Sequence, residues 1–194
     1  MGRTSDARER LIQSGMELIH AGGYTQAGVQ EICDQAGVRK GSFYHFFPSK
    51  GDLALAVVER FQEQAREIFL DRALASDLPP GERILRFFTL AGEIQQGFKE
   101  ADGWVKGCPF ANLALEMSTR DQALRLLLEQ VLQGVIQQLE GVAREAGQPP
   151  SAAQRTAEAI FSLFEGAILL AKTRNDPEVI RRMGAVAQTL IEMA

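Results

Sequence analysis

The sequence predicts an all-α fold, and three observations lead to this class. The seven prolines fall between helix-like segments or in their first turns, where proline does not break a helix. Apolar residues recur at spacings of three and four, and no convincing segment alternates apolar and polar residues as a half-buried strand does. Hydrophobic residues make up 45% of the 194 residues, which is enough to fill a core without disulfides or metals. We therefore expect helices separated by short breaks.

The N-terminal part predicts three helices, over residues 5–21, about 29–36 and about 39–46. Gly22 and Gly23 end the first helix, because glycine readily adopts the left-handed conformation of a C-terminal cap. Gly37 ends the second helix in the same way, and Pro48 stops the third.

Capping residues mark the later helices. Ser49 caps the fourth with Asp52 as its partner, Thr119 and Gln122 offer a capping box for a long helix, and Asp176 caps the last one. The expected helices cover residues 49–75, 82–99, 109–117, about 119–146, 152–174 and 177–193, with a linker at 77–81 and a loop at 100–107.

The second and third helices form a predicted helix-turn-helix over residues 29–48. Small residues, Cys33 and Ala36, stand where the two helices meet, and Gly37 allows the positive φ that the turn needs. Apolar residues spaced for the inner faces are Ile32, Val38, Phe43 and Phe46. The outer face carries donors that reach DNA phosphates and base edges: Arg39, Lys40, Ser42, Tyr44 and His45. The alternative is a helical hairpin with a solvated polar face.

The run GVRKGSFYHFFPSKGDLALAV is similar to the DNA-binding domain of TetR-family transcriptional regulators, and the resemblance covers about residues 8–58. It implies a helix-turn-helix DNA-binding domain over residues 1–50 and a helical ligand-binding and dimerisation domain over residues 51–194. It also implies a homodimer on a palindromic double-stranded operator, released by a small-molecule inducer. Repression is the commoner mode in the family, and activation stays open.

The resemblance assigns roles to individual residues of the DNA-binding domain, which is called the reading domain below. Lys40, Ser42, Tyr44 and His45 match positions that meet DNA, and Lys50 matches a phosphate-binding lysine. Tyr24 matches an aromatic residue that packs the first helix over the second. The family commonly has Thr or Ser as the cap of the second helix, and this chain departs from that pattern. Ala27 and then Gly28 stand there, so the hydroxyl that contacts phosphate is missing, and Thr25 or Gln26 would have to replace it.

The middle helices are where TetR-family sensors place their pocket. Ligand pockets are mostly apolar with a few polar groups, and aromatic stripes are also typical of plain cores. The candidate ligand residues are Phe87, Phe88, Trp104, Cys108, Phe110, Asn112, Leu113, Glu116, Met117, Phe161, Phe164 and Glu165.

Cys108 precedes Pro109 and is expected near a helix N-terminus, which makes a thiolate more reactive. The segments GCPFANLALEMS and GAILLAK resemble a branch of electrophile-responsive repressors, and Cys108 and Lys172 match a cysteine and a lysine of that branch. An alternative function is therefore a thiol-based electrophile or redox sensor. The simpler interpretation is a structural cysteine.

The last two helices are apolar on wide arcs, so they need cover on more than one side. A partner subunit is the simplest cover, and burial within one subunit is the alternative. The predicted dimer residues are Ile160, Leu163, Ala167, Leu170, Met183, Val186 and Leu190.

Other classes of protein are disfavoured by absent motifs. No metal-ligand spacing, phosphate-binding glycine loop or nucleophile motif occurs, so we expect no enzyme activity, no metal and no cofactor. The most apolar stretch, residues 157–171, contains Glu158 and Glu165 and is a poor membrane span, and no secretion signal is evident, so a cytoplasmic protein is expected. A ligand-independent architectural DNA-binding protein is a remaining alternative.

The net charge of −4 does not exclude DNA binding, because it is unevenly distributed. Residues 1–50 hold six Lys and Arg against five Asp and Glu, whereas residues 51–194 hold 15 against 20. The acidity therefore belongs to the expected sensor half.

Overall fold

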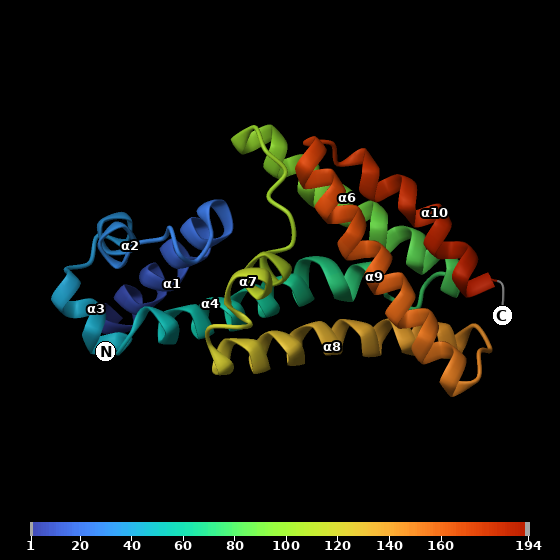
Figure 1. Cartoon of the computed structure of the whole chain (residues 1–194), viewed down its shortest axis with the longest axis horizontal. Helices are drawn as coiled ribbons and strands as arrows, with labels where there is room; N and C mark the ends of the chain where they lie inside the picture. The colour runs from blue at the N-terminus through green and yellow to red at the C-terminus, as the bar shows by residue number, and fades with distance from the viewer. Residues whose placement is uncertain (1, 193–194) are drawn as a thin grey trace. The chain divides into compact units, whose positions relative to one another are not determined.

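The computed structural model describes residues 2–192, and the part it describes is built from helices joined by turns (Figure 1). The elements in chain order are α1 (Gly2–Gly22), α2 (Val29–Ala36), α3 (Lys40–Phe46), α4 (Lys50–Ala65), a π-helical turn η1 (Arg66–Leu70), α5 (Asp71–Ala73), α6 (Pro80–Asp102), α7 (Pro109–Met117), α8 (Gln122–Glu145), α9 (Pro150–Arg174) and α10 (Glu178–Glu192). The all-α prediction is confirmed. The expected end of the last helix at residue 193 lies outside the described residues.

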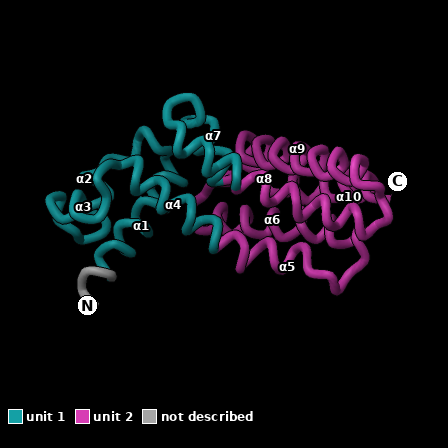
Figure 2. Tube along the Cα trace, turned by 90° about the horizontal axis from the view of Figure 1, so that it is seen from below, with its two compact units in different colours: residues 1–63, 109–130 teal, residues 64–108, 131–194 magenta. Residues whose placement is uncertain are grey.

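The chain forms two compact units, shown in two colours in Figure 2. The first comprises residues 1–63 and 109–130, and the second comprises residues 64–108 and 131–194. The predicted boundary after residue 50 separates DNA binding from ligand binding and dimerisation, and it stays a prediction. The boundaries of the two compact units lie at other residues. In particular, α7 belongs to the first unit, although the sequence places it in the predicted sensor half.

The first unit is organised by α1, which packs against both α2 and α7. Leu11, Ile12, Gly15 and Ile19 are buried on one face of this helix, where they recur at spacings of three and four, and Leu18 beside them is half-buried. The helix ends at Gly22, and Gly23 follows with a φ of 89°, which an L side chain rarely adopts.

The second unit is built around α6, α9 and α10, with α10 packed on both other helices (Figure 1). Arg83 is buried in this unit, where its Nε donates to the Leu74 carbonyl and its guanidinium pairs with Glu145. The largest fully buried side chains of the unit are Phe87, Phe88, Ile84, Leu139, Ile160 and Ile180.

The predicted helix caps divide into confirmed and corrected ones. Ser49 and Asp52 form the expected cap, with Ser49 Oγ accepting from the Asp52 N–H at 3.2 Å. Asp176 accepts from the Glu178 N–H at 3.1 Å. The long helix begins at Gln122, and Asp121 rather than Thr119 caps it by accepting from the Leu124 N–H at 3.0 Å.

The predicted fourth helix is interrupted. Instead of one helix over residues 49–75, a π-helical turn separates α4 from the short α5, with the Asp71 N–H bonded to the Arg66 carbonyl. A π turn inserts one residue and rotates the chain that follows relative to the helix before it. In η1 it accompanies the placement of Phe69 and Leu70 against the core of the second unit.

Candidate functional site

The corner of the helix-turn-helix is closed as the sequence predicts. Cys33 is fully buried, Ala36 nearly so, and Gly37 takes a φ of 62°. The turn is fixed by the Val38 N–H, which donates to the Cys33 carbonyl at 2.9 Å. Burial raises the pKa of the Cys33 thiol, Asp34 raises it further and Lys40 lowers it, so this thiol stays protonated. Cys33 is therefore a packing residue.

The inner face of α3 differs in one residue from the prediction. Phe43 is fully buried and its ring centroid lies 5.8 Å from that of Phe47, which is also buried. Phe46, the predicted inner residue, is only half-buried and lines a surface groove instead. The reason is that the chain leaves the helix at Phe47, whose extended backbone turns its ring back onto Phe43.

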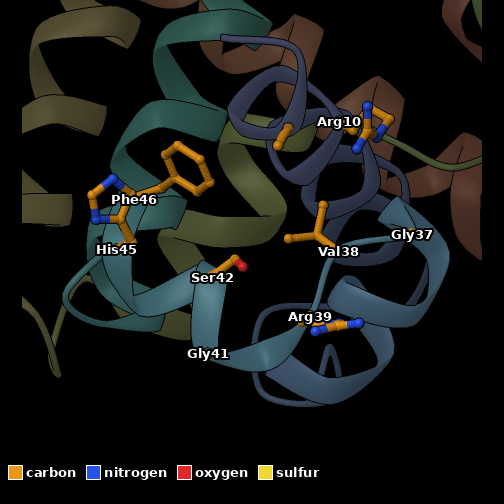
Figure 3. Close-up of a pocket in the computed structure, with 9 residues that line it drawn as sticks. Arg10, Gly37, Val38, Arg39, Gly41, Ser42, His45 and Phe46 are labelled. Atoms are coloured by element: carbon orange, nitrogen blue, oxygen red, sulfur yellow. The ribbon is translucent and has the colours of Figure 1, made fainter. Parts of the chain in front are cut away.

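The outer face of α3 presents the predicted donors to solvent. Arg39, Lys40, Ser42, Tyr44 and His45 are all exposed, Tyr44 by 51%. An open groove of about 520 Å³ lies between α1 and the side of α3 that carries Ser42 and His45. Figure 3 shows side chains that line it. Its lining residues include Arg10, Arg39, Ser42, His45 and Phe46.

Arg10 is a residue of this groove that sequence reasoning missed. Its Nε donates to the Ala36 carbonyl at 2.9 Å, and its guanidinium pairs with Asp6. Only its positive charge could have drawn attention to it, because the spacing of 26 residues to Ala36 follows no local pattern. It ties α1 to the end of α2.

Lys50 is held against the turn that precedes α2. Its Nζ donates to the carbonyls of Tyr24 at 2.8 Å and Ala27 at 3.1 Å, and lies 4.2 Å from the centroid of the Tyr24 ring. Burial lowers the pKa of Lys50, while the charge of Glu116 raises it. An ammonium has three donors, so a phosphate contact by Lys50 stays a prediction.

Glu116 on α7 contacts the same turn. Its carboxylate accepts from the N–H groups of Tyr24 at 2.8 Å and Thr25 at 2.6 Å. Burial raises its pKa, but hydrogen bonds from Thr25 and Tyr24 and the charge of Arg120 together hold it below the ordinary value. This placement differs from the predicted role of Glu116 in a ligand pocket, because both oxygens already accept backbone hydrogen bonds.

The other predicted ligand residues of α7 also lie in the first unit. Phe110, Leu113 and Met117 are buried, and the Phe110 ring centroid is 6.3 Å from that of Phe61. Asn112 is half-buried on the same helix.

The second unit brings four of the predicted aromatic residues together. Phe87 and Phe164 have ring centroids 4.5 Å apart, and Phe88 lies 5.4 Å from Phe164. Phe161 approaches Phe164 at 6.4 Å. The prediction missed Phe69, whose ring centroid is 4.9 Å from that of Phe87. The rotation at η1 explains the omission, because a continuous helix was expected there.

Cys108 and Glu165 form a polar pair in the same unit. The half-buried Cys108 thiol donates a hydrogen bond to the Glu165 carboxylate. Burial raises the pKa of Glu165, and the thiol hydrogen bond offsets only part of that rise. Glu165 stands four residues after Phe161 on α9, so the two share a helix face.

The loop that leads to Cys108 is fixed by two amides. The buried Gln95 accepts from the Gly107 N–H at 2.9 Å and donates to the Gly107 carbonyl at 3.1 Å. Asn175, with a φ of 51°, accepts from the Val105 N–H at 2.9 Å. Trp104, a predicted ligand residue, is 70% exposed on this loop and therefore lies outside the aromatic cluster.

Comparison with known proteins decides the family. Residues 11–57 match bacterial regulatory proteins of the tetR family. Residues 84–186, more than half of the chain, match the C-terminal domain of LmrA/YxaF-like transcriptional regulators. The chain belongs to the TetR family of transcriptional regulators. This membership makes it a regulator and not an enzyme.

Several TetR-family proteins are similar over most of the chain. The transcriptional regulator AcuR of Cereibacter sphaeroides is 33% identical over 89% of this chain and 79% of its own. The repressor NemR of Escherichia coli is 28% identical, with 96% and 94% covered. Among solved structures, the regulatory protein TetR from Rhodobacter sphaeroides has a TM-score of 0.82 and 31% identity, covering 95% of this chain and 98% of that one. E. coli NemR in its reduced form has a TM-score of 0.80 and 25% identity, covering 95% and 97%.

TetR-family regulators bind DNA and small molecules and are typically dimers. The predicted dimer residues divide into three groups in this chain. Ile160 and Ala167 are buried in the core of their own subunit, so they are not free to meet a partner. Leu170 and Val186 are 43% and 48% exposed, and the remaining ones, Leu163, Met183 and Leu190, are half-buried. Leu169, 55% exposed beside Leu170, was not predicted.

In residues 2–192, no helix combines the length and the apolarity that crossing a bilayer requires.

Proposed function

We propose that this TetR-family regulator represses transcription by binding a palindromic operator as a homodimer, and that a small-molecule inducer releases it. The observation that carries the proposal is the outer face of α3. A buried Phe43 fixes the helix, while Arg39, Lys40, Ser42, Tyr44 and His45 stand in solvent. Such a face has the donors that a major groove and its phosphates require.

Two copies of α3 are needed for a palindromic site. Recognition helices of a dimer enter successive major grooves when they are about 34–36 Å apart. The exposed apolar residues Leu169, Leu170 and Val186 on α9 and α10 support a homodimer, because side chains of this kind favour burial against a partner.

We place the inducer in the second unit, beside the cluster of Phe87, Phe161 and Phe164 and the Cys108–Glu165 pair. This is the arrangement of an apolar site with a few polar groups. An inducer weakens operator binding if it binds best to a conformation in which the spacing of the two recognition helices no longer fits successive major grooves.

The test selects DNA fragments from the source genome with the purified chain and titrates the enriched fragment in a gel shift. The proposal is supported if the chain binds the fragment selectively and if a small molecule handled by the products of the neighbouring genes abolishes this binding. Absence of any enriched fragment overturns it. Enrichment without a ligand that shifts the melting temperature favours the architectural DNA-binding alternative.

A second candidate, a thiol-based electrophile or redox sensor, is favoured by Cys108. The thiol is partly exposed, directly precedes α7 and bonds to Glu165. One solved relative, E. coli NemR, is described in a reduced form. Operator release by electrophiles in the unchanged chain, lost in Cys108→Ser, supports this candidate. Equal release in both rejects it.

A further inference from the structure

We propose that Glu116 is a positioning residue for DNA reading: its carboxylate, on a helix outside the helix-turn-helix, holds the turn that precedes α2. The inference rests on the DNA binding proposed above, and it assigns Glu116 to the reading domain rather than to the ligand pocket. The contacts that carry it lie within the first unit.

The carboxylate and the turn are matched atom to atom. Oε2 accepts from the Tyr24 N–H and Oε1 from the Thr25 N–H, at 2.8 and 2.6 Å, across 92 and 91 residues of sequence. Two adjacent N–H groups of one turn thus meet both oxygens of one carboxylate. A β-carbon added to Gly23 would lie 3.0 Å from Oε2, so the chain is also shaped to let the carboxylate approach.

The turn needs such support because α2 has no side-chain cap. Its N-cap is Gly28, which makes no capping side-chain hydrogen bond, and Ala27 precedes it. Uncapped N-terminal N–H groups leave the entry of a helix less firmly fixed. Here Lys50 donates to the carbonyls of Tyr24 and Ala27, while Glu116 accepts from the N–H groups of Tyr24 and Thr25.

The position of α2 matters for reading because α3 packs on it. If the turn loosens, α2 and α3 no longer keep a fixed orientation toward the major groove of the DNA. The contacts to phosphates and the contacts to bases then both weaken. Pre-organised groups bind more tightly because their ordering cost is already met in the free protein.

The sign of the charge makes the proposal testable. Simple electrostatics predicts that removing a carboxylate from a DNA-binding unit strengthens binding to the polyanion. The positioning role predicts weaker binding. Glu116→Gln keeps the size of the side chain but offers one acceptor oxygen to two N–H donors.

The experiment measures operator affinity and its salt dependence for the full chain and for Glu116→Gln, with Glu59→Gln as the matched control. Glu59 is an exposed carboxylate on α4 in the same unit. We expect Glu116→Gln to weaken binding about tenfold, the size of one missing hydrogen bond to a charged group. The slope of the logarithm of the binding constant against the logarithm of the salt concentration should be smaller in magnitude by about 0.9 for each phosphate that the variant no longer binds. Glu59→Gln should bind as tightly as the unchanged chain or slightly more tightly.

Stoichiometric titration gives the active fraction of each protein, which separates positioning from a general loss of folded protein. A lower active fraction with unchanged affinity and slope overturns the proposal. Glu116→Asp is the second variant, because it keeps the charge but shortens the reach, and it too should bind more weakly. Unchanged affinity in both Glu116 variants overturns the proposal, whereas failure of the unchanged chain to bind any DNA overturns the proposed function itself.

Discussion

Lys40 begins α3 and stands exposed, so its contribution to binding can be separated from folding. We expect Lys40→Ala to weaken operator binding. If Lys40 reads a base, the loss is about 1–3 kcal/mol and the preference for that base is relaxed. If Lys40 binds phosphate, the loss is the same for all DNA sequences. The melting temperature should stay unchanged. Gel-shift titration on operator variants measures both effects.

The matched control for Lys40 is Arg155→Ala, which removes one exposed positive charge from α9 in the second unit. It should leave operator affinity within the experimental error. Equal losses in the two variants would show that only net charge matters, and the assigned reading face would then lose its support.

Glu165 predicts a pH dependence of stability. Burial raises its pKa in the folded chain above the value of 4.5 expected when unfolded, despite the Cys108 hydrogen bond. The folded state therefore holds the proton more tightly, and stability is lost as pH rises from the unfolded pKa through the folded one. Glu165→Gln does not titrate, so its free energy of unfolding relative to the unchanged chain should rise with pH.

Urea denaturation between about pH 5 and 8 measures this difference. Glu158→Gln, an exposed position on the same helix, is the control for the loss of one carboxylate. A difference that stays constant with pH, or that equals the control, contradicts the assigned environment of Glu165.

Residue roles were predictable where one local pattern determines them. Gly37 and Cys33 follow from the geometry of a helix corner, and the exposure of Lys40 follows from the periodicity of α3. The role of Glu116 could not be predicted, because its partners lie 91 and 92 residues away and are backbone groups. Phe69 was missed because its position depends on the π turn before it.

At the scale of elements, glycine, proline and capping residues fixed most helix boundaries to within a few residues. The exceptions depend on tertiary packing. η1 interrupts the expected fourth helix where Phe69 and Leu70 meet the core, and Asp121 displaces Thr119 as the cap of α8. Sequence patterns carry little information about a π turn, because its extra residue leaves no characteristic side chain.

The dimer face of α9 and α10 is an element-scale prediction. We expect Leu170→Glu to convert the dimer to monomers, because a two-fold interface would bury the new carboxylate twice without a partner. Leu115→Glu makes the same change at an 84% exposed position on α7, and it should remain dimeric. Sedimentation equilibrium distinguishes the two, and a dimeric Leu170→Glu would place the interface elsewhere.

At the scale of the whole molecule, the chain passes from the second unit to the first between Cys108 and Pro109. Cys108 ends the loop fixed by Gln95 and Asn175, and α7 starts at the next residue, Pro109. Further along the same helix, Glu116 holds the turn before α2.

Induction by a ligand carries a reciprocal requirement. If the inducer weakens operator binding, the operator must weaken inducer binding by the same factor, typically about 5–150-fold. Isothermal titration calorimetry of the inducer with and without operator measures that factor. Equal inducer affinities in both titrations would exclude release by linkage.

Footprinting of the selected operator tests the central claim, a dimer with two reading helices, most directly. We predict two protected half-sites of related, inverted sequence, with centres about 10–10.5 base pairs or a multiple apart. Lys40→Ala should weaken both half-sites equally. A single protected half-site without an inverted copy, or protection that ignores sequence, would contradict the claim.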